Sequence, residues 1–157
     1  MNARLDYRGT AIAANFGKHL NSAGQAVSDS SLPAATQALV KIRASQINGC
    51  AMCTDAHTKD AEHAGESPVR LNLVAVWREA TVFTEAERAA LELAEQGTRI
   101  ADAAGGVSDE VWQNAAKYYD EDQLMALVCV IALINAYNRM NVIVQTPAGD
   151  YQPGQFG

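Results

Sequence analysis

The strongest constraint on the fold lies near the end of the chain, in a long segment that is apolar on every side. Asp120, a residue type that caps helices, precedes it, and the segment continues to Val144 without proline or glycine. A helix of this kind has no polar face to turn toward water, so other parts of the protein must cover it. We expect the central helix of a helical core, buried further within an oligomer.

Helix signals also divide the rest of the chain, and no stretch shows the period-two alternation, bounded by hairpin turns, that marks β-strands. Pro33 and Ser67-Pro68 are typical of helix starts, and Thr84 with Glu87 fits a capping box. The sequence therefore predicts an all-α fold. The expected helices span residues 9–22, 33–47, 50–65, 67–77, 84–100, 108–119 and 120–144.

With 157 residues, the chain has the length of one domain, which we place at residues 1–146. Residues 147–157, with two prolines, three glycines and no periodicity, are expected to form a mobile or partner-draped tail.

Charge and hydrophobicity exclude several classes of partner. The 18 acidic residues outnumber the 12 basic ones, for a net charge of −6, which disfavours nucleic-acid binding by bulk attraction. The N-terminal residues lack the apolar core of a signal peptide. The unbroken apolar run over residues 124–134 is shorter than the roughly 20 residues of a membrane span. We therefore expect a cytoplasmic protein with neither a nucleic-acid nor a membrane partner.

Two of the three cysteines, Cys50 and Cys53, lie three residues apart, and His57 follows four residues later. On a helix these steps place all three side chains on one face. Asn48-Gly49 is a pair that ends helices, so Cys50 is expected at the start of the next helix, where unpaired backbone N–H groups favour a thiolate. The third cysteine, Cys129, lies in the apolar run and is expected to be buried.

This arrangement suits peroxide chemistry. A Cys53 thiolate attacks a hydroperoxide and becomes a sulfenic acid, which Cys50 then converts to a disulfide. His57 moves the proton, and an external dithiol restores the thiols, with no metal or organic cofactor.

Other uses of the same residues remain open. Cys50, Cys53 and His57 with His63 or Asp60 would make four zinc ligands, although zinc sites usually join separate segments. The two cysteines would also fit a pair of inert buried thiols, or a non-enzymatic redox sensor whose disulfide alters assembly or partner binding. Thioredoxin-like exchange is disfavoured because no strand-helix-strand pattern surrounds the pair.

Residues 43–59, RASQINGCAMCTDAHTK, are similar to the signature of the alkylhydroperoxidase D-like proteins, within the carboxymuconolactone decarboxylase superfamily. The similarity continues through Trp77-Arg78-Glu79, residues 83–88 and residues 134–139. It implies an all-helical subunit assembled into homo-trimers or homo-hexamers that reduces hydroperoxides. The decarboxylases of the superfamily generally lack the cysteine pair, so its presence favours the peroxidase branch.

By the same resemblance, Cys53 forms the sulfenic acid, and Cys50 acts as proton donor and resolving thiol. The reductant in the best-known branch is a lipoyl-bearing protein. One departure concerns the glutamate that usually stands twelve residues before the first cysteine and completes a proton relay with the histidine. Here that position is Ala38. The carboxylates considered as substitutes are Glu79 first, followed by Asp55, Asp60 and Glu66.

The remaining conspicuous side chains are given structural roles. Asn135, Asn138 and Arg139 are expected to make structural hydrogen bonds, and His19 and His63 to lie at the surface. The aromatic residues assigned to core or subunit contacts are Trp77, Trp112, Tyr118, Tyr119 and Tyr137.

Overall fold

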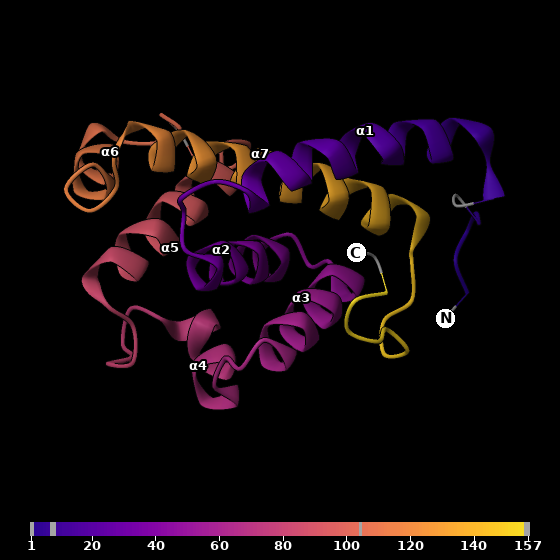
Figure 1. Cartoon of the computed structure of the whole chain (residues 1–157), viewed down its shortest axis with the longest axis horizontal. Coiled ribbons are helices and arrows are strands. Elements are labelled where there is room, and N and C mark those ends of the chain that lie inside the picture. The colour runs from indigo at the N-terminus through magenta and orange to yellow at the C-terminus, as the bar shows by residue number, and fades with distance from the viewer. Residues whose placement is uncertain (1, 7–8, 104, 156–157) are drawn as a thin grey trace.

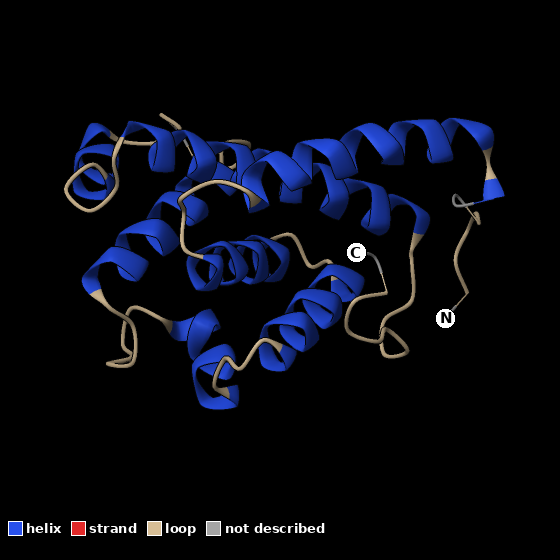
Figure 2. Cartoon of the chain, viewed as in Figure 1, coloured by secondary structure: helices blue, strands red, loops and turns tan. Residues whose placement is uncertain are grey.

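The computed structural model describes residues 2–6, 9–103 and 105–155. Within these ranges every element is helical and no strand occurs, which confirms the all-α prediction (Figure 2). The elements are α1 (Ala11–Ser28), α2 (Ala34–Ile47), α3 (Ala51–His63), α4 (Pro68–Leu73), the 3₁₀ turn η2 (Val74–Val76), α5 (Glu85–Thr98), α6 (Asp109–Ala115) and α7 (Glu121–Val144).

Most helix boundaries follow from local capping chemistry. Thr84 and Glu87 form the predicted capping box at the start of α5, and Asp120 with Gln123 forms another at the start of α7. The predicted first helix is too short, since α1 continues to Ser28 through the serine- and glycine-rich stretch. Its last turn buries Val27 in the main core, and this tertiary contact outweighs the weak helix propensity of that stretch.

Helix α7 is the centre of the subunit. It packs against α1, α2, α3 and α5, and Figure 1 shows it running alongside α1 above α2 and α3. Leu127 and Val130 of α7 share a core with Val40 of α2 and Leu93 of α5. By length and composition alone α7 could also cross a membrane, but contact with four other helices is the position of a core helix.

One strip of α7 is exposed, contrary to the expected burial on all sides. Met125 is 60% exposed, and Val128 and Cys129 are also exposed. These positions lie three and four residues apart, so they share one helix face, and it points away from the core. The prediction that Cys129 is buried is therefore wrong for the subunit. Burial of this strip in an oligomer stays a prediction.

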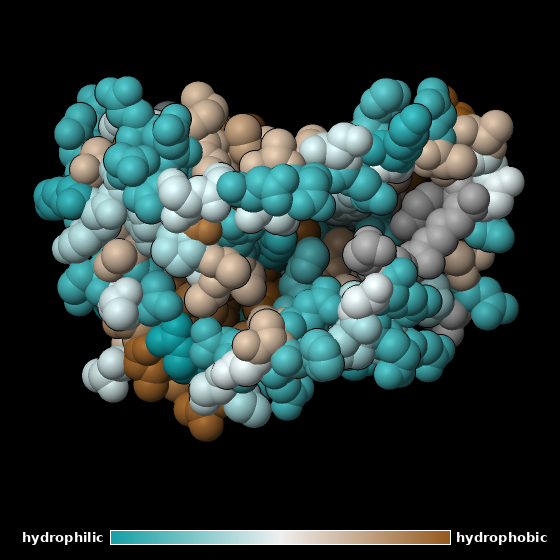
Figure 3. All heavy atoms as spheres, viewed as in Figure 1, coloured by the Kyte–Doolittle hydropathy of each residue, from teal (hydrophilic) through white to brown (hydrophobic). Residues whose placement is uncertain are grey.

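The predicted helix over residues 108–119 ends earlier, at Ala115. The chain then turns, which buries Tyr119 and lets its hydroxyl donate to the carbonyl oxygen of Ala86 at 2.8 Å. Trp77 is also buried, whereas Trp112 and Tyr118 are exposed. On the face seen in Figure 3, hydrophobic atoms gather mainly in the region of α4, where Val69 is exposed.

A buried carboxylate joins α2, α5 and the segment after η2. Glu95 of α5 accepts hydrogen bonds from Arg43 Nε at 2.7 Å and Trp77 Nε1 at 2.9 Å, and it also pairs with Arg78. Burial alone would raise the pKa of Glu95, but the hydrogen bonds from Arg78, Trp77 and Arg43 outweigh it and lower the pKa. The segments around Trp77 and Arg43 therefore meet in one ion-pair network.

The segment after α7 lies against α3, which differs from the mobile tail expected from the sequence (Figure 1). Lys59 Nζ donates to the carbonyl oxygens of Gly149 at 2.8 Å and Tyr151 at 3.1 Å. The Tyr151 hydroxyl donates to Asp60 Oδ1 at 2.7 Å. The Tyr151 side chain is only 3% exposed and packs in one cluster with Cys50 and Cys53. Charged residues of α3 thus hold an aromatic side chain in the hydrophobic cluster that contains the cysteine pair.

Tyr151→Ala removes a large buried side chain from this cluster and opens it to water, so a water-soluble phosphine should reduce the Cys50–Cys53 disulfide several-fold faster than in the wild type. The measurement is the rate at which two new thiols appear per chain. Tyr118→Ala, which removes an exposed ring of the same kind elsewhere, is the matched control and should not change the rate. Equal reduction rates in the wild type and Tyr151→Ala would show that the ring does not limit access.

Glu95→Gln leaves Arg43 partly buried without its ion-pair partner, so at pH 7 it should lower the free energy of unfolding by about 3 kcal/mol. Because the pKa of Glu95 is lowered by folding, its stabilisation is present above its unfolded-state pKa and is lost as the pH falls through the lower folded-state value. The deficit of the variant should therefore shrink on acidification. Urea unfolding at several pH values checks this.

Glu92→Gln provides the control, because Glu92 contacts the same Arg78 in a more exposed pair. A deficit for Glu95→Gln that is constant with pH, or no larger than that of Glu92→Gln, would contradict the network.

Candidate active site

A left-handed glycine places Cys50 at the start of α3. After α2 ends at Ile47, with Asn48 as its C-cap, Gly49 adopts a φ of +65°, a conformation that glycine takes without strain. The Cys50 N–H then donates back to the carbonyl oxygen of Ser45 at 3.0 Å. Cys50 is the N-cap residue of α3, and its Sγ accepts a hydrogen bond from the backbone N–H of Cys53 at 3.3 Å. The predicted helix start at Cys50 is confirmed.

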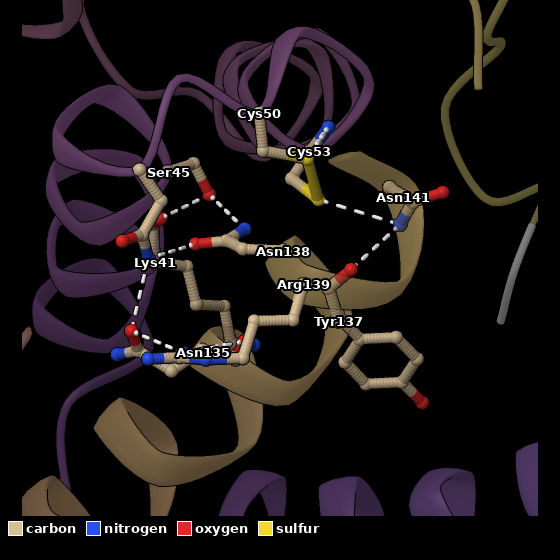
Figure 4. Close-up of a disulfide and its surroundings, with 10 residues drawn as sticks. Lys41, Ser45, Cys50, Cys53, Asn135, Tyr137, Asn138, Arg139 and Asn141 are labelled. Carbon is tan, nitrogen blue, oxygen red and sulfur yellow. Dashed lines mark hydrogen bonds between the residues drawn. A yellow bond between two sulfur atoms is a disulfide. The ribbon is translucent and has the colours of Figure 1, made fainter. Parts of the chain in front are cut away.

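Cys50 and Cys53 are joined by a disulfide, with their Cα atoms 5.4 Å apart (Figure 4). Both are buried, at 2% and 5% exposure, in a cluster that includes Ile134 of α7 and Tyr151 of the C-terminal segment. The structure therefore holds this pair as a two-electron oxidised dithiol.

Asparagine side chains fasten the cysteine turn to α7. Asn48 Nδ2 donates to Asn135 Oδ1 at 2.9 Å and to Asn138 Oδ1 at 2.8 Å. Asn138 Nδ2 donates in turn to Ser45 Oγ at 3.0 Å (Figure 4). Arg139 Nη1 contacts the backbone and side-chain oxygens of Asn135, both at 3.0 Å. The structural hydrogen bonds expected of these α7 residues are thus present.

A further asparagine, which sequence reasoning missed, reaches the sulfur itself. Asn141 Nδ2 lies 3.5 Å from Sγ of Cys53 and 3.0 Å from the carbonyl oxygen of Tyr137. The signal in the sequence is the regular step of three residues through Asn135, Asn138 and Asn141, which keeps neighbouring members on adjoining parts of one helix surface.

His57 lies on α3 one turn beyond Cys53 and is partly buried. Its pKa is lowered to about 4, chiefly by burial and also by the positive charge of Lys41, while the negative charge of Asp60 opposes both. The imidazole is therefore neutral at pH 7. A neutral imidazole has one N–H donor and one acceptor nitrogen, so it can receive one proton while it releases another.

The carboxylates proposed to replace the family glutamate differ in whether their charge acts on His57. Glu79, the first candidate, is exposed beyond η2, and Glu66 pairs with Arg70. Asp60 is the candidate whose charge acts on His57.

The remaining candidate, Asp55, pairs with Lys59 at 2.8 Å. Sequence reasoning missed Lys41, which stands three residues after Ala38 on α2. Burial lowers the pKa of Lys41, and Asp60 opposes this shift. The charges of a lysine and an aspartate thus both act on the histidine.

The zinc alternative finds no support in the geometry. Among the residues that the structure describes, no group of three or more His, Cys, Asp or Glu side chains is arranged to hold a metal ion. His63, one proposed fourth ligand, is exposed at the end of α3. His19 on α1 is exposed as well, so both histidines lie at the surface as predicted. Asp60, the other proposed ligand, accepts the Tyr151 hydroxyl hydrogen bond.

Known proteins resemble the chain in both sequence and fold. The model of the carboxymuconolactone decarboxylase family matches residues 14–96, more than half of the chain. The uncharacterized protein YdfG of Bacillus subtilis (strain 168) is 42% identical over 113 residues, which are 72% of this chain and 76% of that protein.

A solved structure of a protein of unknown function from Agrobacterium tumefaciens, linked by its description to the antioxidant defence protein AhpD, is 31% identical. It superimposes with a TM-score of 0.87 over 96% of this chain and 100% of that chain. The debrominase Bmp8 shares the fold alone, with a TM-score of 0.75 at 19% identity over 84% of this chain and 70% of its own. The chain thus belongs to the carboxymuconolactone decarboxylase family and has the AhpD-like fold.

Proposed function

We propose that this protein is a thiol-dependent peroxidase that reduces hydroperoxides through Cys53, Cys50 and His57. The observation that carries the proposal is the Cys50–Cys53 disulfide at the first turn of α3, one turn before a neutral histidine. The family includes enzymes, and the relation to AhpD supports redox chemistry over decarboxylation.

The first step starts from the reduced dithiol. The Cys53 thiolate attacks one oxygen of the hydroperoxide, an S–O bond forms and the O–O bond breaks. The alkoxide takes a proton and leaves as an alcohol, and Cys53 becomes a sulfenic acid. Sulfur is oxidised by two electrons and the peroxide is reduced by two.

The second step regenerates the disulfide seen in the structure. The Cys50 thiol attacks the sulfur of the sulfenic acid, an S–S bond forms, and the hydroxyl group leaves with the Cys50 proton as water. An external dithiol, such as a lipoyl-linked one, then returns two electrons and two protons by thiol–disulfide exchange. Prompt capture by Cys50 protects Cys53 from irreversible oxidation.

His57 serves as a proton relay in this scheme. An imidazole with a pKa of about 4 is too weak a base to keep the proton of a thiol, whose ordinary pKa is about 8.5. One ring nitrogen can accept a proton while the other releases one, so the ring does not stay charged. This favours delivery of a proton to the departing alkoxide, directly or through water.

A cytoplasmic homo-trimer or homo-hexamer is part of the proposal. The exposed strip of Met125, Val128 and Cys129 on α7 supports the assembly of subunits, because an apolar strip on a central helix is suited to contact with another subunit.

A redox sensor is the second candidate, and the contact of Tyr151 with the cysteine pair favours it. In this case reduction or oxidation of the pair changes how the C-terminal segment packs against α3, and a partner protein binds one of the two conformations. Repeated turnover with a dithiol reductant distinguishes the enzyme from a sensor, which is oxidised once and stays oxidised.

The two cysteines should fail in different ways when replaced. Cys53→Ser should abolish hydroperoxide consumption, whereas Cys50→Ser should leave a sulfenic acid on Cys53 that a dimedone-type probe labels. Cys129→Ser, the control, should keep full turnover because Cys129 is exposed on α7 and lies outside the buried cluster of the cysteine pair. Equal residual turnover in the Cys53 and Cys50 variants would count against the mechanism.

The pH dependence of the oxidation rate should follow the ionisation of the Cys53 thiol alone. Because His57 is neutral throughout the neutral range, the rate constant for oxidation of the reduced protein should rise with pH through one ionisation, with no inflection near the usual histidine pKa of about 6.5. His57→Gln should lower that rate constant by about 100-fold without moving the inflection. Stopped-flow oxidation across the pH range measures both.

His63→Gln, at the exposed end of the same helix, should behave as the wild type. An inflection near pH 6.5 that His57→Gln removes would show that His57 titrates during catalysis and would contradict the relay.

A further inference from the structure

Asn141 approaches the reactive sulfur from α7. Its side chain is buried, at 8% exposure, and its Nδ2 lies 3.5 Å from Sγ of Cys53 (Figure 4). The same nitrogen donates to the carbonyl oxygen of Tyr137 at 3.0 Å. The asparagine therefore provides a polar side-chain contact between the central helix and the second cysteine.

The Tyr137 carbonyl oxygen fixes which end of the Asn141 amide faces the sulfur. A carbonyl oxygen accepts hydrogen bonds but does not donate them, so the atom facing it must be the NH₂ nitrogen. One hydrogen of that nitrogen goes to Tyr137 and the other is available to the sulfur. The orientation that satisfies the helix backbone thus also aims an N–H group at Cys53.

The other end of the amide argues against a purely structural role. Asn141 Oδ1 is one of two buried side-chain polar atoms without a hydrogen-bond partner among the residues that the structure describes. In Figure 4 this oxygen points away from the disulfide. An unsatisfied buried carbonyl oxygen costs stability, which an apolar side chain of similar size would avoid. The N–H group aimed at the sulfur is the feature that an apolar residue could not supply.

The two sulfurs have different donors. Sγ of Cys50 accepts from the backbone N–H of Cys53, which any residue at that position would supply. Sγ of Cys53 receives the side-chain donor of Asn141, which depends on this residue. A hydrogen bond to a charged acceptor is stronger than one to a neutral acceptor, so this contact favours the thiolate over the thiol.

We propose that Asn141 donates a hydrogen bond to the reduced Cys53 sulfur, stabilises its thiolate and holds it in position for attack. As a statement about catalysis this rests on the proposed peroxidase function, whereas the effect on thiol ionisation does not. Sγ of Cys53 is the reacting atom, and Asn141 acts on it directly.

The test measures the ionisation of Cys53 alone, in a Cys50→Ser, Cys129→Ser background where Cys53 is the single thiol. The rate of alkylation by iodoacetamide as a function of pH gives the Cys53 pKa. Adding Asn141→Ala should raise this pKa by about one unit, a tenfold loss of thiolate at neutral pH. Asn141→Asp has the same shape but places a carboxylate there, so it should raise the pKa further and remains informative if the alanine variant fails to fold.

Gln37→Ala is the matched control, since Gln37 is a buried amide that donates to the carbonyl oxygens of Val27 and Leu32 instead of a sulfur and takes no part in the cysteine turn. It should leave the Cys53 pKa unchanged. An unchanged pKa in both Asn141 variants, or an equal shift in Gln37→Ala, would overturn the proposal.

Hydroperoxide consumption, measured separately on the variants with Cys50 intact, keeps the two proposals distinguishable. A raised Cys53 pKa in a protein that consumes no hydroperoxide would preserve the role of Asn141 and reject the peroxidase. Peroxide turnover with a Cys53 pKa independent of Asn141 would support the peroxidase and reject the role of Asn141.

Discussion

The hydrogen bonds from Asn48 to Asn135 and Asn138 are the interaction on which the rest of the site depends. They tie the turn between α2 and α3 to the central helix, and Asn138 completes the link through Ser45. Because Ser45 also accepts the Cys50 N–H through its carbonyl oxygen, the position of the cysteine turn is fixed from both sides. Together with the packing of Ile134 in the cysteine cluster, this link positions the first turn of α3 against α7.

This polar network is largely buried between α2 and α7, where an unpaired polar group is costly and a paired one specifies a single arrangement. Its members satisfy one another, and the exception is the oxygen of Asn141, beside the cysteine pair. The same burial that makes the network specific lowers the pKa of His57 and keeps it neutral. A thiolate formed in such a place depends on the few N–H donors aimed at it, which gives each donor a large influence on reactivity.

The features predicted correctly from the sequence depend on neighbours along the chain. The capping box at Thr84 and the helix start at Cys50 are local, so a few residues determine them. The exposure of Cys129 and the seating of Tyr151 could not be read in this way, because they depend on which helix faces remain uncovered and on contacts about 90 residues apart. Lys41 was missed for the same reason, since its importance comes from the approach of α2 to His57 on α3.

The most direct test of the account adds one equivalent of an alkyl hydroperoxide to the fully reduced protein, and then counts and maps the remaining thiols by mass spectrometry. The account predicts the loss of two thiols per chain, a Cys50–Cys53 disulfide, one equivalent of alcohol, and a free Cys129. Three remaining thiols with the hydroperoxide unconsumed, or oxidation confined to Cys129, would contradict it.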